Sequence, residues 1–124
     1  MPRILVVEDE PLIAMLLEDW LAELGCDTVG PIGSAPQALA LIGREELDGA
    51  ILDVSLDGHD SFAVADALRA REIPFAFATG HGVSRVAERF RHAPTLVKPY
   101  DFERLRETIA TMLGGGAAAS PSAG

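Results

Sequence analysis

The chain has 124 residues, the size of one ordinary domain, and can bury a hydrophobic core without disulfides or metals. Hydrophobic residues make up 48% of it and charged residues 23%, which excludes a chain that is disordered throughout. A formal net charge of -9 disfavours a nucleic-acid partner, because phosphate backbones are bound by clustered Lys and Arg. The single cysteine, Cys26, cannot form an intrachain disulfide, which agrees with a reducing compartment.

The two ends of the chain set the expected domain limits. The apolar run at 4–7 is interrupted at once by three acidic residues at 8–10, so it is neither a signal-peptide core nor a membrane span. We therefore expect a cytoplasmic protein with no membrane partner. Residues 114–124 read GGGAAASPSAG and lack apolar periodicity, so they cannot offset their own ordering entropy. We expect one domain over 1–113 and a disordered tail over 114–124.

Between these ends, strand-like and helix-like segments alternate five times, a pattern typical of a parallel sheet covered by helices on both faces. The predicted strands are 4–7, 28–32, 50–52, 75–78 and 96–97. The predicted helices are 11–24, 34–43, 61–71, 83–90 and a last helix capped by Asp101. Each helix carries apolar residues at helical spacing, and Ser34 is a suitable N-cap for the second. The sequence thus predicts an α/β fold.

Polar side chains follow every predicted strand except the second. They are Glu8 and Asp9, Asp53, Thr79, and Lys98. Each one alone could be a helix-end charge, a turn former or a solvated lysine. In an open α/β sheet, however, functional groups collect at the carboxyl ends of the strands. The convergence of these residues on one edge predicts a functional site there.

The charges of these residues indicate the chemistry. Carboxylates drawn into one crevice repel each other unless a cation lies among them, and Mg²⁺ prefers a few oxygen ligands. The expected ligands are Glu8, Asp9, Asp53 and a backbone carbonyl near Ser55. Lys98 can stabilise one phosphate oxygen and Thr79 another, which leaves Asp53 as the nucleophile in a phosphoryl transfer.

Four segments together resemble the response-regulator receiver family: VVEDE at 6–10, LDVSL at 52–56, ATG at 78–80 and VKPY at 97–100. The resemblance spans roughly residues 3–113. It implies a flavodoxin-like (βα)5 doubly wound parallel sheet with strand order 2-1-3-4-5. It also implies that Asp53 accepts a phosphoryl group from a histidine, with Mg²⁺ at the acidic pair and a cis bond before Pro99.

Three departures from the common family pattern stand out. Thr95 occupies the position, three before the lysine, where the family usually has an aromatic switch residue. The stretch PFAFATGHG at 74–82 resembles the receiver subgroup named FATGUY, with His81 where that subgroup has tyrosine. Asp57 and Gly58 replace a commoner proline-containing sequence. Because Thr95 is not aromatic, the resemblance does not extend to the usual coupling between the site threonine, Thr79, and an aromatic residue at position 95.

The resemblance implies a single-domain response regulator of a two-component system or phosphorelay. It would catalyse only its own phosphorylation and dephosphorylation, and so would not be an enzyme in the usual sense. Its expected partners are a sensor histidine kinase or histidine phosphotransfer protein docking on the first helix. A protein target could bind the face made by the fourth helix, fifth strand and last helix, where arginines cluster.

Alternatives from other classes remain open. One is a small phosphohydrolase with Asp53 as nucleophile and Asp57 as acid, although the chain leaves no cap domain to enclose a substrate. Another is a receiver that binds partners without being phosphorylated. A nucleotide-binding module is weaker, because the turn at 8–11 reads EDEP and lacks the G-x-G-x-x-G that cradles phosphate.

Overall fold

The computed structural model of the protein describes residues 1–56, 59–80, 88–90 and 93–118. The strands of its main sheet are β1 (Arg3–Val7), β2 (Asp27–Ile32), β3 (Gly49–Asp53), β6 (Phe75–Thr79) and β7 (Thr95–Val97). The helices are α1 (Pro11–Glu23), α2 (Ala35–Arg44), α3 (Phe62–Ala70) and α4 (Phe102–Ala118), with a 3-10 turn at Glu88–Phe90. Two short strands, β4 (Ser55–Leu56) and β5 (His59–Asp60), form a separate antiparallel pair.

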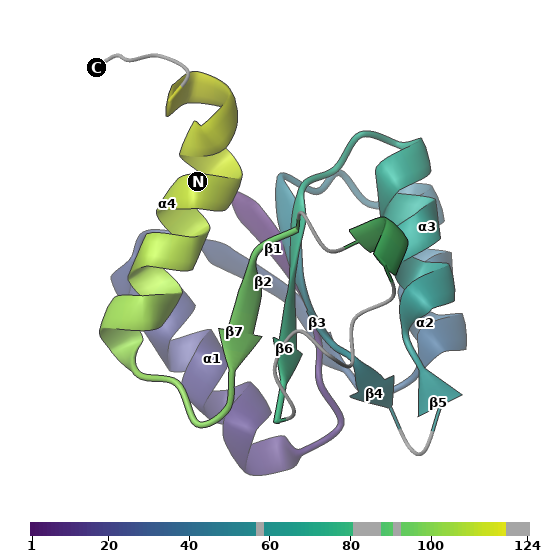
Figure 1. Cartoon of the computed structure of the whole chain (residues 1–124), viewed down its shortest axis with the longest axis horizontal. Helices are drawn as coiled ribbons and strands as arrows, with labels where there is room; N and C mark the ends of the chain where they lie inside the picture. The colour runs from purple at the N-terminus through teal and green to yellow at the C-terminus, as the bar shows by residue number, and fades with distance from the viewer. Residues whose placement is uncertain (57–58, 81–87, 91–92, 119–124) are drawn as a thin grey trace.

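The main sheet has the order β2-β1-β3-β6-β7, and all its neighbouring strands pair in parallel. Counting only the strands of this sheet, the order is 2-1-3-4-5, so the predicted flavodoxin-like topology is confirmed. All of its strands run in the same direction, and their carboxyl ends lie at the lower edge of the view in Figure 1. The order reverses between β1 and β3, and ligands of such sheets bind at this point.

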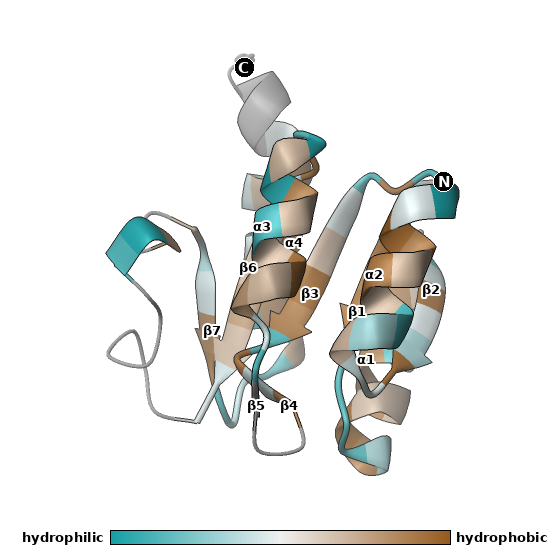
Figure 2. Ribbon diagram, turned by 90° about the vertical axis from the view of Figure 1, so that its right-hand side faces the viewer, coloured by the Kyte–Doolittle hydropathy of each residue, from teal (hydrophilic) through white to brown (hydrophobic). Residues whose placement is uncertain are grey.

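Helices cover both faces of the sheet, α1 and α4 on one side and α2 and α3 on the other (Figure 1). Alternate residues of each strand point to opposite faces, so β1 sends Leu5 and Val7 into one core and Ile4 and Val6 into the other. Because both faces of the central strands β1, β3 and β6 are buried, these strands are mostly apolar, and β1 and β3 are brown over most of their length in Figure 2.

Local signals explain where the second and last helices begin. The Ser34 hydroxyl accepts a hydrogen bond from the Gln37 amide at 3.4 Å, and an Asp101 carboxylate oxygen accepts one from the Arg104 amide at 2.9 Å. Both residues therefore act as the N-caps that the sequence predicts. No helix among the described residues is long and apolar enough to cross a membrane.

Three details differ from the prediction or lie beyond it. The β4–β5 pair was not predicted. Of the helix expected at 83–90, residues 83–87 lie outside the described part of the chain, and Glu88–Phe90 form a 3-10 turn. The last helix runs on to Ala118, past residue 113 where we expected the domain to end. Extending an existing helix avoids the cost of nucleation, so α4 continues through the glycines at 114–116 although glycine is a poor helix former. Residues 119–124 lie outside the described residues.

Candidate functional site

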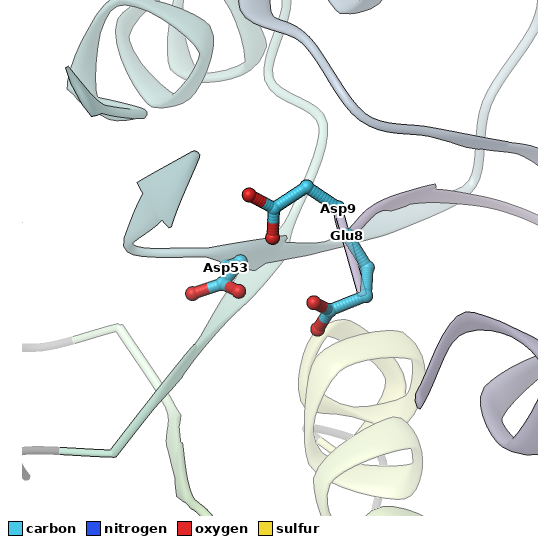
Figure 3. A group of neighbouring side chains, drawn as sticks. All are labelled: Glu8, Asp9 and Asp53. Carbon is cyan, nitrogen blue, oxygen red and sulfur yellow. The ribbon is translucent and has the colours of Figure 1, made fainter. Parts of the chain in front are cut away.

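Three acidic side chains meet at the carboxyl ends of β1 and β3. Glu8, Asp9 and Asp53 each offer a carboxylate oxygen, and these oxygens lie within 4.8 Å of one another (Figure 3). They meet because β1 and β3 pair in parallel up to Val7 and Leu52, so both chains leave the sheet at one place. Glu8 and Asp53 are buried and Asp9 is exposed, which gives the cluster an open side.

Lys98 brings a cation into this cluster from the end of β7. Its Nζ lies 3.0 Å from Asp53 Oδ2 and 3.2 Å from Glu8 Oε1. Its backbone amide donates to the Thr79 carbonyl at 2.8 Å, which anchors the turn, and the following bond to Pro99 is cis as the resemblance implies. Burial alone would lower the pKa of Lys98, but the hydrogen bonds and charges of Asp53 and Glu8 raise it. Lys98 is therefore a fixed positive charge.

Glu8 is the most perturbed carboxyl of the site. Burial raises its pKa to about 7, and the negative charge of Asp53 adds to this effect. The Glu10 amide, which donates to Glu8 Oε2 at 3.0 Å, and the charge of Lys98 act in the opposite direction. The Glu8 amide donates to the Ile32 carbonyl at 2.9 Å, so β2 fixes the backbone of this residue.

Asp53 faces a cleft of about 420 Å³. The cleft is lined by Asp9, Glu10, Asp53, Val54, Ser55, Thr79, Gly80 and Lys98. The Ser55 amide donates to Asp53 Oδ1 at 3.2 Å and Lys98 Nζ donates to Oδ2, so each carboxylate oxygen accepts a hydrogen bond. Such contacts hold the carboxylate in one orientation.

The structure brings together all six residues that the sequence predicts for the site. The carboxylates of Glu8, Asp9 and Asp53 lie close together and Lys98 contacts Glu8 and Asp53, while Ser55 and Thr79 line the same cleft. Asp57 of the hydrolase alternative and His81 lie outside the described residues, as do Arg85 and Arg91 of the predicted arginine face. Sequence reasoning missed Ser61, whose hydroxyl donates to the Asp53 carbonyl at 2.6 Å, because a serine before a helix reads as an ordinary cap.

The donor set fits Mg²⁺. Clustered carboxylates with one open side suit a hard cation that takes a few protein oxygens and keeps several waters. Neither cysteine nor histidine belongs to this group of carboxylates, which disfavours zinc at this place. The position of the group at the strand-order reversal agrees with where such sheets bind ligands.

Comparison with known proteins agrees with this geometry. Residues 4–110 match the response regulator receiver domain family. The solution structure of SdrG from Sphingomonas melonis Fr1 is 46% identical, with a TM-score of 0.82 over 91% of this chain and 97% of that one. The response regulator TrrA from Thermotoga maritima, solved in complex with Mg²⁺-BeF, is 29% identical with a TM-score of 0.80, over 91% of this chain and 100% of that one.

Among curated proteins, the transcriptional regulatory protein PdtaR of Mycobacterium tuberculosis is 33% identical over 111 residues. The match covers 86% of this chain and 54% of PdtaR, so the chain spans about half the length of this relative. The fold and the family match together define the class of protein. The chain belongs to the response regulator receiver domain family.

Position 95, where the resemblance implies an aromatic residue, lies close to the site. Thr95 is half-buried at the start of β7, and its hydroxyl donates to the Ala93 carbonyl at 3.4 Å. It lines a groove of about 740 Å³ between β7 and α4, which also includes Lys98 and Tyr100. This chain therefore has no aromatic side chain at the position where the resemblance implies one.

Proposed function

We propose that the protein accepts a phosphoryl group on Asp53 and so acts as a response regulator in a two-component system or phosphorelay. The observation that carries this proposal is the position of Asp53. Its carboxylate is held between Lys98 and the Ser55 amide at the edge of an acidic cleft. The BeF3-activated conformation of SdrG, also 46% identical, offers a precedent in a relative for a receiver in an activated state.

The reaction follows from these side chains. A carboxylate oxygen of Asp53 attacks phosphorus and forms a new O–P bond, while the bond from phosphorus to the donor breaks. The electron pair of that bond stays with the donor, an imidazole nitrogen of a phosphohistidine. Lys98 is placed to pair with a phosphoryl oxygen as charge develops there, and the Thr79 hydroxyl to donate to another.

A metal ion would complete the site. Glu8, Asp9, Asp53 and the backbone carbonyl of Ser55 would hold Mg²⁺, which would neutralise the charge of the incoming phosphoryl group. Lys98 alone cannot balance three carboxylates and a phosphoryl group. Phosphorylation should therefore depend on the metal.

Phosphorylation would also act as a switch. The phosphoryl group carries about 1.5 to 2 negative charges and replaces the single charge of the Asp53 carboxylate, which favours movement of Lys98 and Thr79 toward the new oxygens. Because Thr95 replaces the usual aromatic, we assign the chain to the FATGUY subgroup, whose distinctive stretch includes β6 and Thr79. The readout surface would be the β7–α4 side of the molecule.

The phosphate donor would dock on α1. Leu12, Met15 and Leu16 are exposed on this helix, although large apolar side chains are usually buried. Leu16 also lines a groove of about 360 Å³ that reaches Pro99 and Lys98. A histidine kinase or histidine phosphotransfer protein seated there would bring its phosphohistidine to the cleft. We expect this exchange to take place in the cytoplasm.

The similarity to SdrG extends over nearly the whole of that chain and supports a receiver function, and our proposal includes a role as a shuttle of phosphoryl groups. The test is incubation with acetyl phosphate, with and without Mg²⁺, followed by intact-mass measurement of wild type and Asp53→Asn. The wild type should gain one phosphoryl group only with Mg²⁺, and Asp53→Asn should gain none. Turnover of added phosphomonoesters would instead favour the hydrolase alternative.

A further inference from the structure

Ser61, the residue immediately before α3, is fully buried and bonded to the backbone of Asp53. Its Oγ donates a hydrogen bond of 2.6 Å to the Asp53 carbonyl, and its side chain has no exposed surface. A buried hydroxyl is costly unless it is paired, so this contact is strongly determined. The last residue pair between β1 and β3 is Val7 with Leu52, so Asp53 lies one residue beyond the pairing with β1.

A second hydrogen bond ties Ser61 to the same strand end. Its amide donates to the Val54 carbonyl at 2.9 Å, so Ser61 binds two consecutive carbonyls where β3 ends. Its own carbonyl accepts from the amides of Val64 and Ala65 at 3.0 and 3.1 Å. These contacts join the end of β3 to the first turn of α3, and the β4–β5 pair places Ser55 opposite Asp60, the residue next to Ser61.

The β4–β5 pair carries a residue that contacts the Asp53 side chain. Ser55, the first residue of β4, lines the cleft and donates its amide to Asp53 Oδ1 at 3.2 Å. Opposite, Lys98 holds Oδ2 at 3.0 Å. The orientation of the carboxylate therefore depends on where Ser55 lies, and Ser55 is paired with Asp60, whose neighbour Ser61 is bonded to the end of β3.

The geometry points to Ser61 as a positioning residue for the phosphoacceptor site, acting through the Asp53 carbonyl and the β4–β5 pair that carries Ser55. This inference rests on the proposed function, because it assigns Ser61 to the same Mg²⁺ and phosphoryl site. Ser61 is not among the residues that line the cleft. Residues that orient metal ligands without binding the metal themselves also affect affinity, and their loss weakens metal binding by roughly tenfold or more in other sites.

The test compares Ser61→Ala with Val64→Ala, a matched control. Val64 is also fully buried in the first turn of α3, so its truncation loosens the same helix without removing the hydroxyl. The measurements are the Kd for Mg²⁺ alone by titration calorimetry, the amide hydrogen exchange of Ser55 in metal-free protein, and the free energy of unfolding in urea. Ser61→Cys keeps a weak donor of similar shape, should Ser61→Ala not fold.

We expect Ser61→Ala to weaken Mg²⁺ binding about tenfold and to speed exchange at Ser55. Ser61→Cys should fall between it and wild type. Val64→Ala should bind Mg²⁺ within about twofold of wild type while losing stability. Wild-type Mg²⁺ affinity in both Ser61 variants, or an equal loss of Mg²⁺ affinity in Val64→Ala, would overturn the role of Ser61 and leave the proposed function standing. A wild type that does not bind Mg²⁺ would overturn the proposed function itself.

Discussion

Lys98 and Asp53 form an ion pair of 3.0 Å between the ends of two strands, β7 and β3, that are not neighbours in the sheet. The same Lys98 nitrogen lies 3.2 Å from Glu8 Oε1 at the end of β1. One lysine thus bridges carboxylates from two strands across the site. Before any metal binds, it is the main charge that offsets the mutual repulsion of Glu8 and Asp53.

The first prediction follows from this bridge. Lys98→Ala leaves the buried carboxylates of Glu8 and Asp53 without a cation, so the free energy of unfolding of metal-free protein should fall by about 1–3 kcal/mol. Added Mg²⁺ should recover part of this loss. Urea denaturation measures both effects. Arg44→Ala, which removes an exposed cation 3.9 Å from Glu45, should change stability by less than about 0.5 kcal/mol. A metal-free Lys98→Ala protein as stable as wild type would contradict the role of the bridge.

The second prediction concerns pH. Since the pKa of Glu8 is about 7 in the folded protein and its ordinary value is 4.5, the folded state holds this proton more tightly than the unfolded state. The contribution of Glu8 to stability is therefore complete below pH 4.5 and is lost as pH rises to about 7. In thermal unfolding of metal-free protein, the Tm of Glu8→Gln should rise relative to the Tm of wild type as pH increases through this window.

A control of opposite sign is available at Glu103. Its hydrogen bond with Arg106 lowers its pKa, so its small contribution is present at higher pH and is lost as pH falls. The Tm of Glu103→Gln should therefore fall slightly relative to the Tm of wild type as pH rises. If Glu8→Gln and wild type kept a constant difference in Tm between pH 4.5 and 7.5, the raised pKa of Glu8 would be refuted.

The third prediction concerns the aromatic cluster under the 3-10 turn. Phe90 is 1% exposed, and its ring is packed between other rings and two guanidinium groups. Its neighbours are Phe62 at 5.8 Å, Phe75 at 5.8 Å, Phe77 at 5.6 Å, and the guanidinium carbons of Arg89 at 4.6 Å and Arg69 at 4.8 Å. Phe90→Ala should lower the free energy of unfolding by about 3–5 kcal/mol in urea titrations. Val97→Ala, at a 51% exposed position, should stay within about 0.5 kcal/mol of wild type. A loss below about 1 kcal/mol for Phe90→Ala would argue against this packing.

The fourth prediction separates docking from chemistry. Leu12→Ser and Met15→Ser change exposed residues of α1 that do not line the acidic cleft. Each should slow phosphotransfer from a phosphorylated histidine phosphotransfer protein by about tenfold, and leave the rate with acetyl phosphate unchanged. The matched control is Leu39→Ser, which alters an exposed leucine of α2 on the opposite face of the sheet. If Leu39→Ser impaired transfer as much as the α1 variants, α1 would not be the docking surface.

Much of the fold and the site could be predicted because both depend on local patterns. Continuous apolar runs mark the buried strands, and the rule that ligands lie at strand ends brings Glu8, Asp53 and Lys98 together from distant positions. Contacts that the strand-end rule does not cover could not be predicted. The bond from Ser61 to the Asp53 carbonyl requires the loop to return to β3, and the β4–β5 pair is too short to leave a periodic signal. The extension of α4 to Ala118 runs against its own sequence, because glycines at 114–116 are poor helix formers.

The central claim is that Asp53 itself becomes phosphorylated. Borohydride reduces an acyl phosphate to an alcohol, so a phosphorylated aspartate becomes homoserine, which peptide mass spectrometry can locate. Wild type treated with acetyl phosphate and Mg²⁺ should give homoserine at position 53 and nowhere else, and omission of Mg²⁺ should abolish it. Homoserine at another acidic residue, or none after full incubation, would contradict the account.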